Sequence, residues 1–197
     1  MSTRYACADC GGGFATDAVV YRCPSCGAAA PSGGFARGIL SVAFDPSLPA
    51  TRTPTGAPVD PHAFLPIPVP GAAAFPAGGT PLVEPARLRE ETGFPDLFLK
   101  NDTLNPSGSL KDRASLLVAA QAIAAGERRV ALASTGNAGA SMAAAGAALG
   151  LEVVLFVPGS APRAKLLQSL LCGAKDVPVR GTYDDAFGLS IEYTAAC

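Results

Sequence analysis

The chain has 197 residues, of which 49% are hydrophobic, and its 15 Lys and Arg residues nearly balance its 16 Asp and Glu residues. This length is sufficient for one full-sized domain with its own core and a small additional unit. The balanced charge argues against a nucleic-acid partner. The amino terminus lacks the apolar stretch of a signal peptide, and no apolar stretch is long enough to span a membrane, so we expect a cytoplasmic protein.

Residues 1–30 form a predicted cysteine unit. Cys7 and Cys10 make one C-x-x-C pair, and Cys23 and Cys26 make a second pair after twelve intervening residues. Two such pairs in a chain without a secretion signal favour metal binding over disulfides. Four thiolates match the tetrahedral preference of zinc and leave no open coordination position. The spacing therefore predicts a structural, zinc-ribbon-like site.

Residues 31–79 are dense in proline and glycine, which disfavours continuous helix and central strand. Apolar residues recur near the end of this segment, at Phe64, Leu65, Ile67 and Val69. We therefore expect a loop-like arm that packs against the rest of the chain. The sole histidine, His62, lies in this arm and is expected to be a surface residue.

Residues 80–197 alternate between predicted strands and helices. The expected strands are 97–100, 129–134, 152–158 and 176–181, and the expected helices are 110–126, 137–150, 162–173 and 183–196. This alternation is typical of βαβ units and a parallel sheet. The helix at 137–150 is so rich in Ala and Gly that it can lie very close to its neighbours.

The sequence NPSGSLKDR (105–113) places a turn directly before Lys111, at the start of a predicted helix. The positive end of a helix dipole disfavours a cation, and only a neutral amine attacks a carbonyl. Local physics therefore leaves two interpretations, a nucleophilic lysine or a solvated charge on an ordinary helix.

A second turn, STGNAGAS (134–141), follows a predicted buried strand and opens the next helix. Its backbone N–H groups and hydroxyls could bind an anion, and ligands of parallel sheets bind at the carboxyl ends of strands. Asn137 would then face the same crevice as Lys111. The alternative is a plain turn in which Gly136 supplies a positive φ angle.

Together the two turns resemble those of the fold-type II pyridoxal-phosphate enzymes, and among these they look most similar to the threonine synthases. The similarity begins at GGTPLVEPARL (78–88), includes both turns, and continues to VRGTYDDAF (179–187). Many of these enzymes also carry a four-cysteine, zinc-ribbon-like unit. The resemblance implies open, mostly parallel sheets with flanking helices, of which this chain would form the amino-terminal part.

The resemblance also implies roles for individual residues. Lys111 would form the Schiff base with pyridoxal phosphate and then transfer protons, and Asn137 would hydrogen-bond the ring hydroxyl of the cofactor. Further residues would bind the substrate or line the lysine turn: Ser134, Thr135, Gly136, Ser107 and Ser109. Thr80 would lie near the site.

The implied reaction converts O-phospho-L-homoserine and water into L-threonine and phosphate, with the cofactor as electron sink. Its substrate is a small phosphorylated amino acid, and the full-length enzyme would be a homodimer.

The sequence departs from the family pattern in one respect. No Gly-rich loop for the cofactor phosphate follows the second turn, and enzymes of this family are usually much longer. We therefore expect this chain alone to bind pyridoxal phosphate poorly and to turn over no substrate.

Two alternatives remain open. The same scaffold supports cysteate synthases, serine/threonine dehydratases and cysteine synthase-like enzymes, although cysteine synthases usually carry T-S-G-N at the second turn. The chain could also be a non-enzymatic zinc-ribbon module that binds a partner.

Overall fold

The computed structural model describes residues 3–18, 22–28, 37–43, 65–69 and 71–196. The chain divides into two compact units, Met1–Pro68 and Val69–Cys197. No helix in the described ranges is long and apolar enough to cross a membrane. The central part of the predicted arm, including Phe64 and His62, lies outside the described residues.

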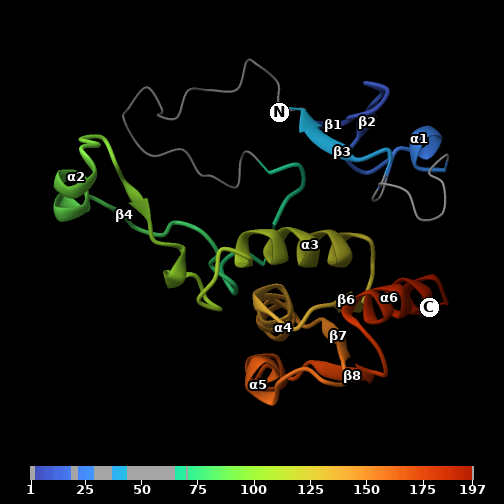
Figure 1. The fold of residues 1–197 in the computed structure, drawn as a ribbon. Coiled ribbons are helices and arrows are strands. Elements are labelled where there is room, and N and C mark those ends of the chain that lie inside the picture. Colours follow the sequence, from blue (N-terminus) through green and yellow to red (C-terminus); the bar gives the residue numbers. More distant parts are fainter. Residues whose placement is uncertain (1–2, 19–21, 29–36, 44–64, 70, 197) are drawn as a thin grey trace. The chain divides into compact units, whose positions relative to one another are not determined.

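The first unit contains a small antiparallel sheet (Figure 1). Its strands are β1 (Arg4–Cys7), β2 (Gly13–Ala15) and β3 (Leu40–Ala43), in the order β2-β1-β3, and α1 (Pro24–Ala28) follows Cys23. We predicted that the cysteine unit ends at residue 30, but β3 belongs to the same sheet. The pairing of β3 with β1 joins residues more than thirty positions apart, so no local pattern announces it.

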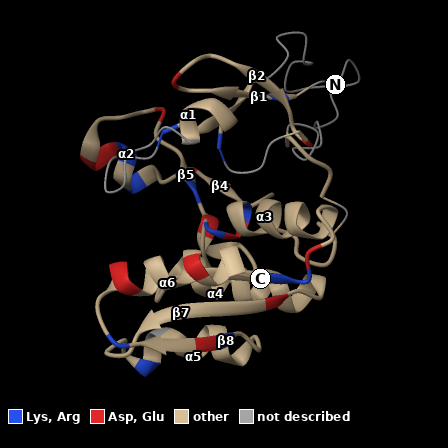
Figure 2. Ribbon diagram, turned by 90° about the vertical axis from the view of Figure 1, so that its right-hand side faces the viewer, with Lys and Arg blue, Asp and Glu red and all other residues tan. Residues whose placement is uncertain are grey.

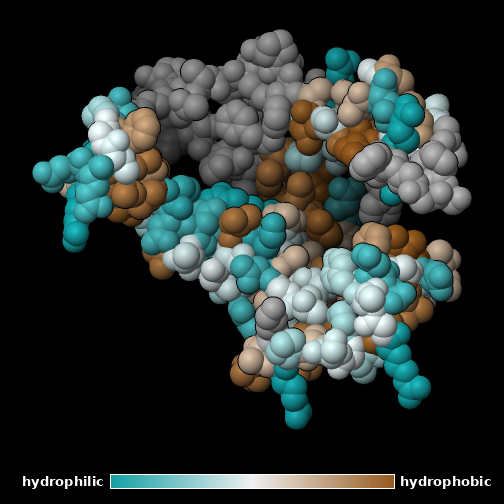
Figure 3. All heavy atoms as spheres, viewed as in Figure 1, coloured by the Kyte–Doolittle hydropathy of each residue, from teal (hydrophilic) through white to brown (hydrophobic). Residues whose placement is uncertain are grey.

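The second unit begins with a two-stranded antiparallel sheet of β4 (Leu82–Val83) and β5 (Leu99–Lys100), which are linked by α2 (Ala86–Thr92). Sequence reasoning expected the strand at 97–100 to belong to the parallel sheet, and this is wrong because its partner is β4. All four strand residues are exposed. Figure 3 shows apolar side chains on the surface in this region, where Leu82 is 62% exposed.

The remaining elements form an α/β layer structure. They are η2 (Asp102–Leu104), α3 (Asp112–Ala124), β6 (Arg129–Ala133), α4 (Asn137–Leu149), β7 (Glu152–Pro158), α5 (Arg163–Leu171), β8 (Lys175–Val179) and α6 (Tyr183–Ala196). The three strands are parallel and follow the order β6-β7-β8. This confirms the predicted open parallel sheet with flanking helices.

Both faces of β7 are covered, which explains its uninterrupted apolar sequence. On one face, Leu155 packs with Met142 of α4, and on the other Phe156 packs with Ala186 of α6. Alternate residues of a strand point to opposite faces, so α4 and α6 lie on opposite sides of the sheet. Figure 2 shows no charged residue on β7 beyond its first, Glu152.

The close approach predicted for α4 is also present. A Cβ added at Gly146 would lie 2.4 Å from the Val153 Cγ2 atom. The other side of α4 packs against α3, and Phe75 is buried in the same cluster as Leu116 and Ala145. Val69, from the end of the predicted arm, packs against this cluster.

Candidate functional site

Lys111 lies directly before α3, at the end of a turn that Pro106 and Gly108 shape as predicted. The Gly108 N–H donates to the Asn105 carbonyl at 2.8 Å, and Gly108 has a φ of +78°, which favours glycine. The Lys111 N–H donates to the Ser109 hydroxyl at 3.2 Å. The Lys111 side chain is exposed, so its amine is accessible to a ligand.

Ser107 and Asp112 close this turn. The fully buried Asp112 carboxylate accepts hydrogen bonds from the Ser107 N–H, at 2.6 Å, and from the Ser107 hydroxyl. The Gln168 side chain of α5 donates to the Ser107 carbonyl at 3.0 Å. The hydroxyls of Ser107 and Ser109 are thus engaged within the turn, and their predicted contact with substrate stays a prediction.

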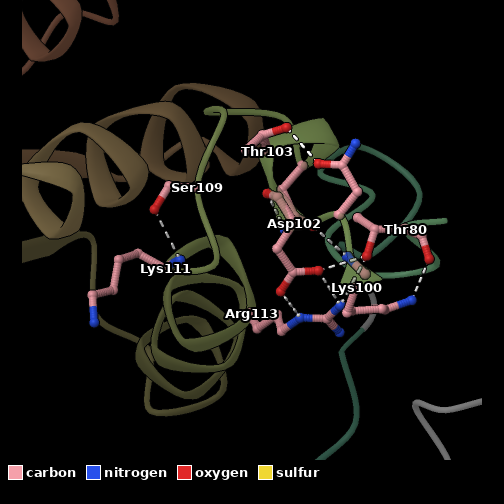
Figure 4. A network of polar contacts seen from close by, with 10 residues as sticks. Thr80, Lys100, Asp102, Thr103, Ser109, Lys111 and Arg113 are labelled. Atoms are coloured by element: carbon pink, nitrogen blue, oxygen red, sulfur yellow. Dashed lines mark hydrogen bonds and ion pairs between the residues drawn. The ribbon is translucent and has the colours of Figure 1, made fainter. Parts of the chain in front are cut away.

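A polar network lies behind the turn (Figure 4). Asp102 accepts a hydrogen bond from the Thr80 hydroxyl at 2.5 Å and forms a two-pronged ion pair with Arg113 at 2.8 and 2.9 Å. Hydrogen bonds from Arg113 and Thr80 hold the pKa of Asp102 well below its usual range, and Asp102 raises the pKa of Arg113. Thr80 therefore has a definite structural contact, whereas Asp102 was missed by sequence reasoning.

The second turn connects β6 to α4. The Ser134 hydroxyl accepts hydrogen bonds from the Gly136 N–H at 3.3 Å and the Gly139 N–H at 3.0 Å, which satisfies donors of the first helical turn. Asn137, the first residue of α4, is exposed and Thr135 is half-buried.

Gly136 does not have the positive φ angle that the plain-turn interpretation required. Its φ is −127°, in the extended range, and no atom lies within 4 Å of a Cβ added there. Neither backbone conformation nor internal packing explains a glycine at this exposed position.

The packing of α3 against α4 brings the two turns to the same end of the helix pair. The Ser141 and Ser115 hydroxyls form a buried hydrogen bond of 2.7 Å between the two helices. Each serine lies four residues, about one helical turn, after Asn137 or Lys111 respectively. Both amino-terminal ends therefore lie near this contact, and they carry a primary amine, on Lys111, and a carboxamide, on Asn137. This donor set fits an aldehyde cofactor with a ring hydroxyl.

The four predicted metal ligands also lie together in the first unit. The Sγ atoms of Cys7, Cys10, Cys23 and Cys26 all lie within 4.8 Å of one another. Tetrahedral zinc with Zn–S bonds of about 2.3 Å requires sulfur atoms about 3.8 Å apart, and Cys10 and Cys23 are separated by 3.9 Å. The geometry fits zinc with only small adjustments.

The loops that carry these cysteines are fixed by local contacts. Gly11, with a φ of +71°, donates its N–H to the Cys7 carbonyl at 2.9 Å. Asp9 accepts a hydrogen bond from the Gly38 N–H at 2.5 Å and pairs with Arg37. Cys172 takes no part in the cluster and packs beside the core of the second unit.

Comparisons with known proteins agree with this arrangement. Residues 74–196 match the family described as "Pyridoxal-phosphate dependent enzyme". The threonine synthase of Methanosarcina acetivorans is 36% identical over 189 residues, which are 93% of this chain and 44% of that protein. The threonine synthase of Mycobacterium leprae is 41% identical over 119 residues, 60% of this chain and 33% of that protein. The chain thus spans less than half the length of these curated relatives.

Two solved structures share the fold. One is the processed form of threonine deaminase isoform 2 from Solanum lycopersicum, with a TM-score of 0.53 and 20% identity over 65% of this chain and 36% of that chain. The other is the apo form of diaminopropionate ammonia lyase from Escherichia coli, with a TM-score of 0.54 and 18% identity over 64% of this chain and 41% of that chain. At these identities the likeness concerns the fold alone.

Proposed function

This chain belongs to the pyridoxal-phosphate dependent enzyme family, and we propose that it supplies the cofactor lysine and the substrate turn of a threonine synthase. The reaction is the conversion of O-phospho-L-homoserine and water into L-threonine and phosphate. A match over 93% of the chain necessarily includes both Lys111 and Asn137, because neither lies near a terminus. The observation that carries the proposal is the Ser115–Ser141 contact, since it brings the two turns together.

Each residue has a role that follows from its chemistry. Lys111 would hold pyridoxal phosphate through its amine, and Asn137 would hydrogen-bond the ring hydroxyl. When bound, the cofactor supplies an electron sink for carbanion charge. The Lys111 Nζ atom would also accept and return protons during the reaction. The free N–H groups at the start of α4, with Thr135, orient the substrate carboxylate above Gly136, where no side chain obstructs it.

A chimera tests the proposal directly. Residues 1–197 are joined to the remaining carboxyl-terminal sequence of the Methanosarcina acetivorans threonine synthase, and phosphate release from O-phospho-L-homoserine is measured. We expect turnover by the chimera and a loss of at least a thousandfold with Lys111→Ala, because the amine takes part in each proton transfer. Lys175→Ala, on β8, is the matched control and should retain activity. Full activity of Lys111→Ala would contradict the proposal.

The same chimera separates the alternative reactions. Phosphate release from O-phospho-L-serine in preference to O-phospho-L-homoserine would favour a cysteate synthase-like enzyme. Turnover of unphosphorylated serine or threonine would favour a dehydratase. The isolated 197-residue chain is expected to release no phosphate and to bind the cofactor poorly, so stoichiometric cofactor absorbance with turnover would contradict that expectation.

For the first unit we propose a structural zinc ion held by Cys7, Cys10, Cys23 and Cys26. Four cysteine ligands leave no position for substrate or water. The ion would therefore stabilise the first unit and take no part in the reaction.

A further inference from the structure

Asp102 is the centre of the polar network behind the lysine turn (Figure 4). Its Oδ1 atom accepts hydrogen bonds from Thr80 and from Arg113 Nη2, and its Oδ2 atom accepts one from Arg113 Nε. Its backbone carbonyl accepts a fourth from the buried Asn105 side chain at 2.9 Å. The Asn105 Oδ1 atom in turn accepts a hydrogen bond from the Gly78 N–H at 2.9 Å. The network thus joins three segments, around Thr80, around Asp102 and at the start of α3.

Arg113 connects this network to Lys111. The two residues are two positions apart at the start of α3, which corresponds to about 200° around a helix axis. They therefore point to nearly opposite sides, and Figure 4 shows the Lys111 side chain extending away from Asp102 and Arg113. Because a two-pronged guanidinium–carboxylate pair restricts orientation as well as distance, holding Arg113 on one side fixes the direction of Lys111 on the other.

We propose that Asp102 is a positioning residue for Lys111, acting through Arg113 and Thr80. This inference rests on the proposed function, in which Lys111 is the cofactor lysine. The Arg113 side chain is 43% exposed and that of Asp102 is 21% exposed, so solvent screens the pair in part. Its main effect is on the orientation of the first turn of α3 relative to the turn at residues 134–137.

Chemical labelling of the chimera described above, which has the remaining carboxyl-terminal sequence, measures this orientation without turnover. In one reaction, excess pyridoxal 5′-phosphate condenses with amines with loss of water, and borohydride then delivers hydride to the imine carbon to give a stable secondary amine. In the other, formaldehyde and cyanoborohydride methylate amines. Peptide mapping gives both rates at Lys111. Formaldehyde reports accessibility, whereas pyridoxal phosphate also requires correct placement beside the second turn.

Asp102→Asn keeps the size of the side chain and removes its charge. We expect the ratio of pyridoxylation to methylation at Lys111 to fall roughly tenfold, because small misplacements of a reacting group are costly. The thermal unfolding midpoint is measured alongside, so that both labelling rates are compared on folded protein. Asp96→Asn, an exposed aspartate in the loop before β5, is the matched control and should leave the ratio unchanged. An unchanged ratio in folded Asp102→Asn overturns the proposal.

Arg113→Lys provides a second variant in case Asp102→Asn does not fold. It keeps the positive charge but loses the two-pronged geometry, so the ratio should fall by a smaller factor, and an unchanged ratio again overturns the proposal. Failure of the proposed function is read separately, from the chimera without substitutions. There, pyridoxal phosphate should modify Lys111 ahead of Lys100 and Lys175, and equal labelling of all three contradicts the assignment of Lys111 itself.

Discussion

At the scale of single residues, Asp176 on β8 carries a carboxylate whose loss of hydration on burial is not offset by hydrogen bonds from the described residues. Both of its carboxylate oxygens are buried without a hydrogen-bond donor among the described residues. Its register partner is Leu155, so it lies on the face of the sheet that packs against α4. Burial raises the pKa of Asp176 because the charged form is poorly solvated there.

We predict that Asp176→Asn stabilises the second unit at neutral pH, by about 1 kcal/mol. The pKa of Asp176 is higher in the folded state than in the unfolded state. Its contribution to the free energy of unfolding is therefore fully present below the unfolded-state pKa and is lost as the pH rises through the folded-state pKa. The advantage of the variant should therefore disappear in acid. Urea unfolding at several pH values checks this, with Asp96→Asn as control, and identical pH dependence of variant and parent would contradict it.

The positions of the candidate site residues were predictable from sequence where the pattern is local, whereas their roles stay predictions. Lys111 and Asn137 each follow a turn and begin a helix, and the four cysteines have a regular spacing. Asp102 was not predictable, because its hydrogen-bond partners Thr80 and Arg113 are distant in the sequence. Asp102 and Arg113 carry opposite charges, but they are eleven positions apart in the sequence, and this separation matches no periodic pattern.

At the scale of elements, the long helices and buried strands follow from sequence, since α3, α4 and β7 carry strong apolar patterns and glycine at or just beyond their ends. The two short antiparallel sheets were not predictable as paired strands. Strands β3, β4 and β5 have between two and four residues each, too few to show an alternation, and their pairing depends on segments far away in the chain.

Replacement of a glycine by alanine should have opposite effects on stability in α4 and in α6. Gly146→Ala in α4 should destabilise the second unit by about 1 kcal/mol or more, because the new Cβ would lie 2.4 Å from Val153 Cγ2 and 3.0 Å from the Leu151 carbonyl. Gly188→Ala in α6 meets no atom within 4 Å and should stabilise by about 0.5–1 kcal/mol through helix propensity.

Thermal and denaturant unfolding of both variants measures these changes. A stabilising Gly146→Ala would show that α4 can move away from β7, contrary to the close packing described for this helix.

At the scale of the whole molecule, the two units differ in what holds them together. Among the described residues, the buried apolar side chains of the first unit are those of Cys7, Cys23 and Pro66, whereas the second unit has three hydrophobic clusters. A unit with so little apolar core depends on additional links for its stability. The proposed zinc ion would be that link.

We predict that removal of zinc by a chelator unfolds the first unit and leaves the second folded. Because ligand binding in such sites supplies folding free energy, hydrogen exchange should rise sharply in residues 3–43 and change little in residues 112–158. Cys10→Ser should reproduce the effect and lose one zinc ion per chain by elemental analysis. Cys172→Ser is the matched control and should retain the ion. Unchanged exchange after complete metal removal would contradict a structural role.

The strand order β6-β7-β8 has a consequence for how the second unit forms during synthesis. Each strand pairs with the one made just before it, so no strand must wait for a distant segment before its hydrogen bonds are made. Domains fold from the amino terminus as the chain emerges from the ribosome. We expect the sheet and its helices to assemble strand by strand, in the order of translation.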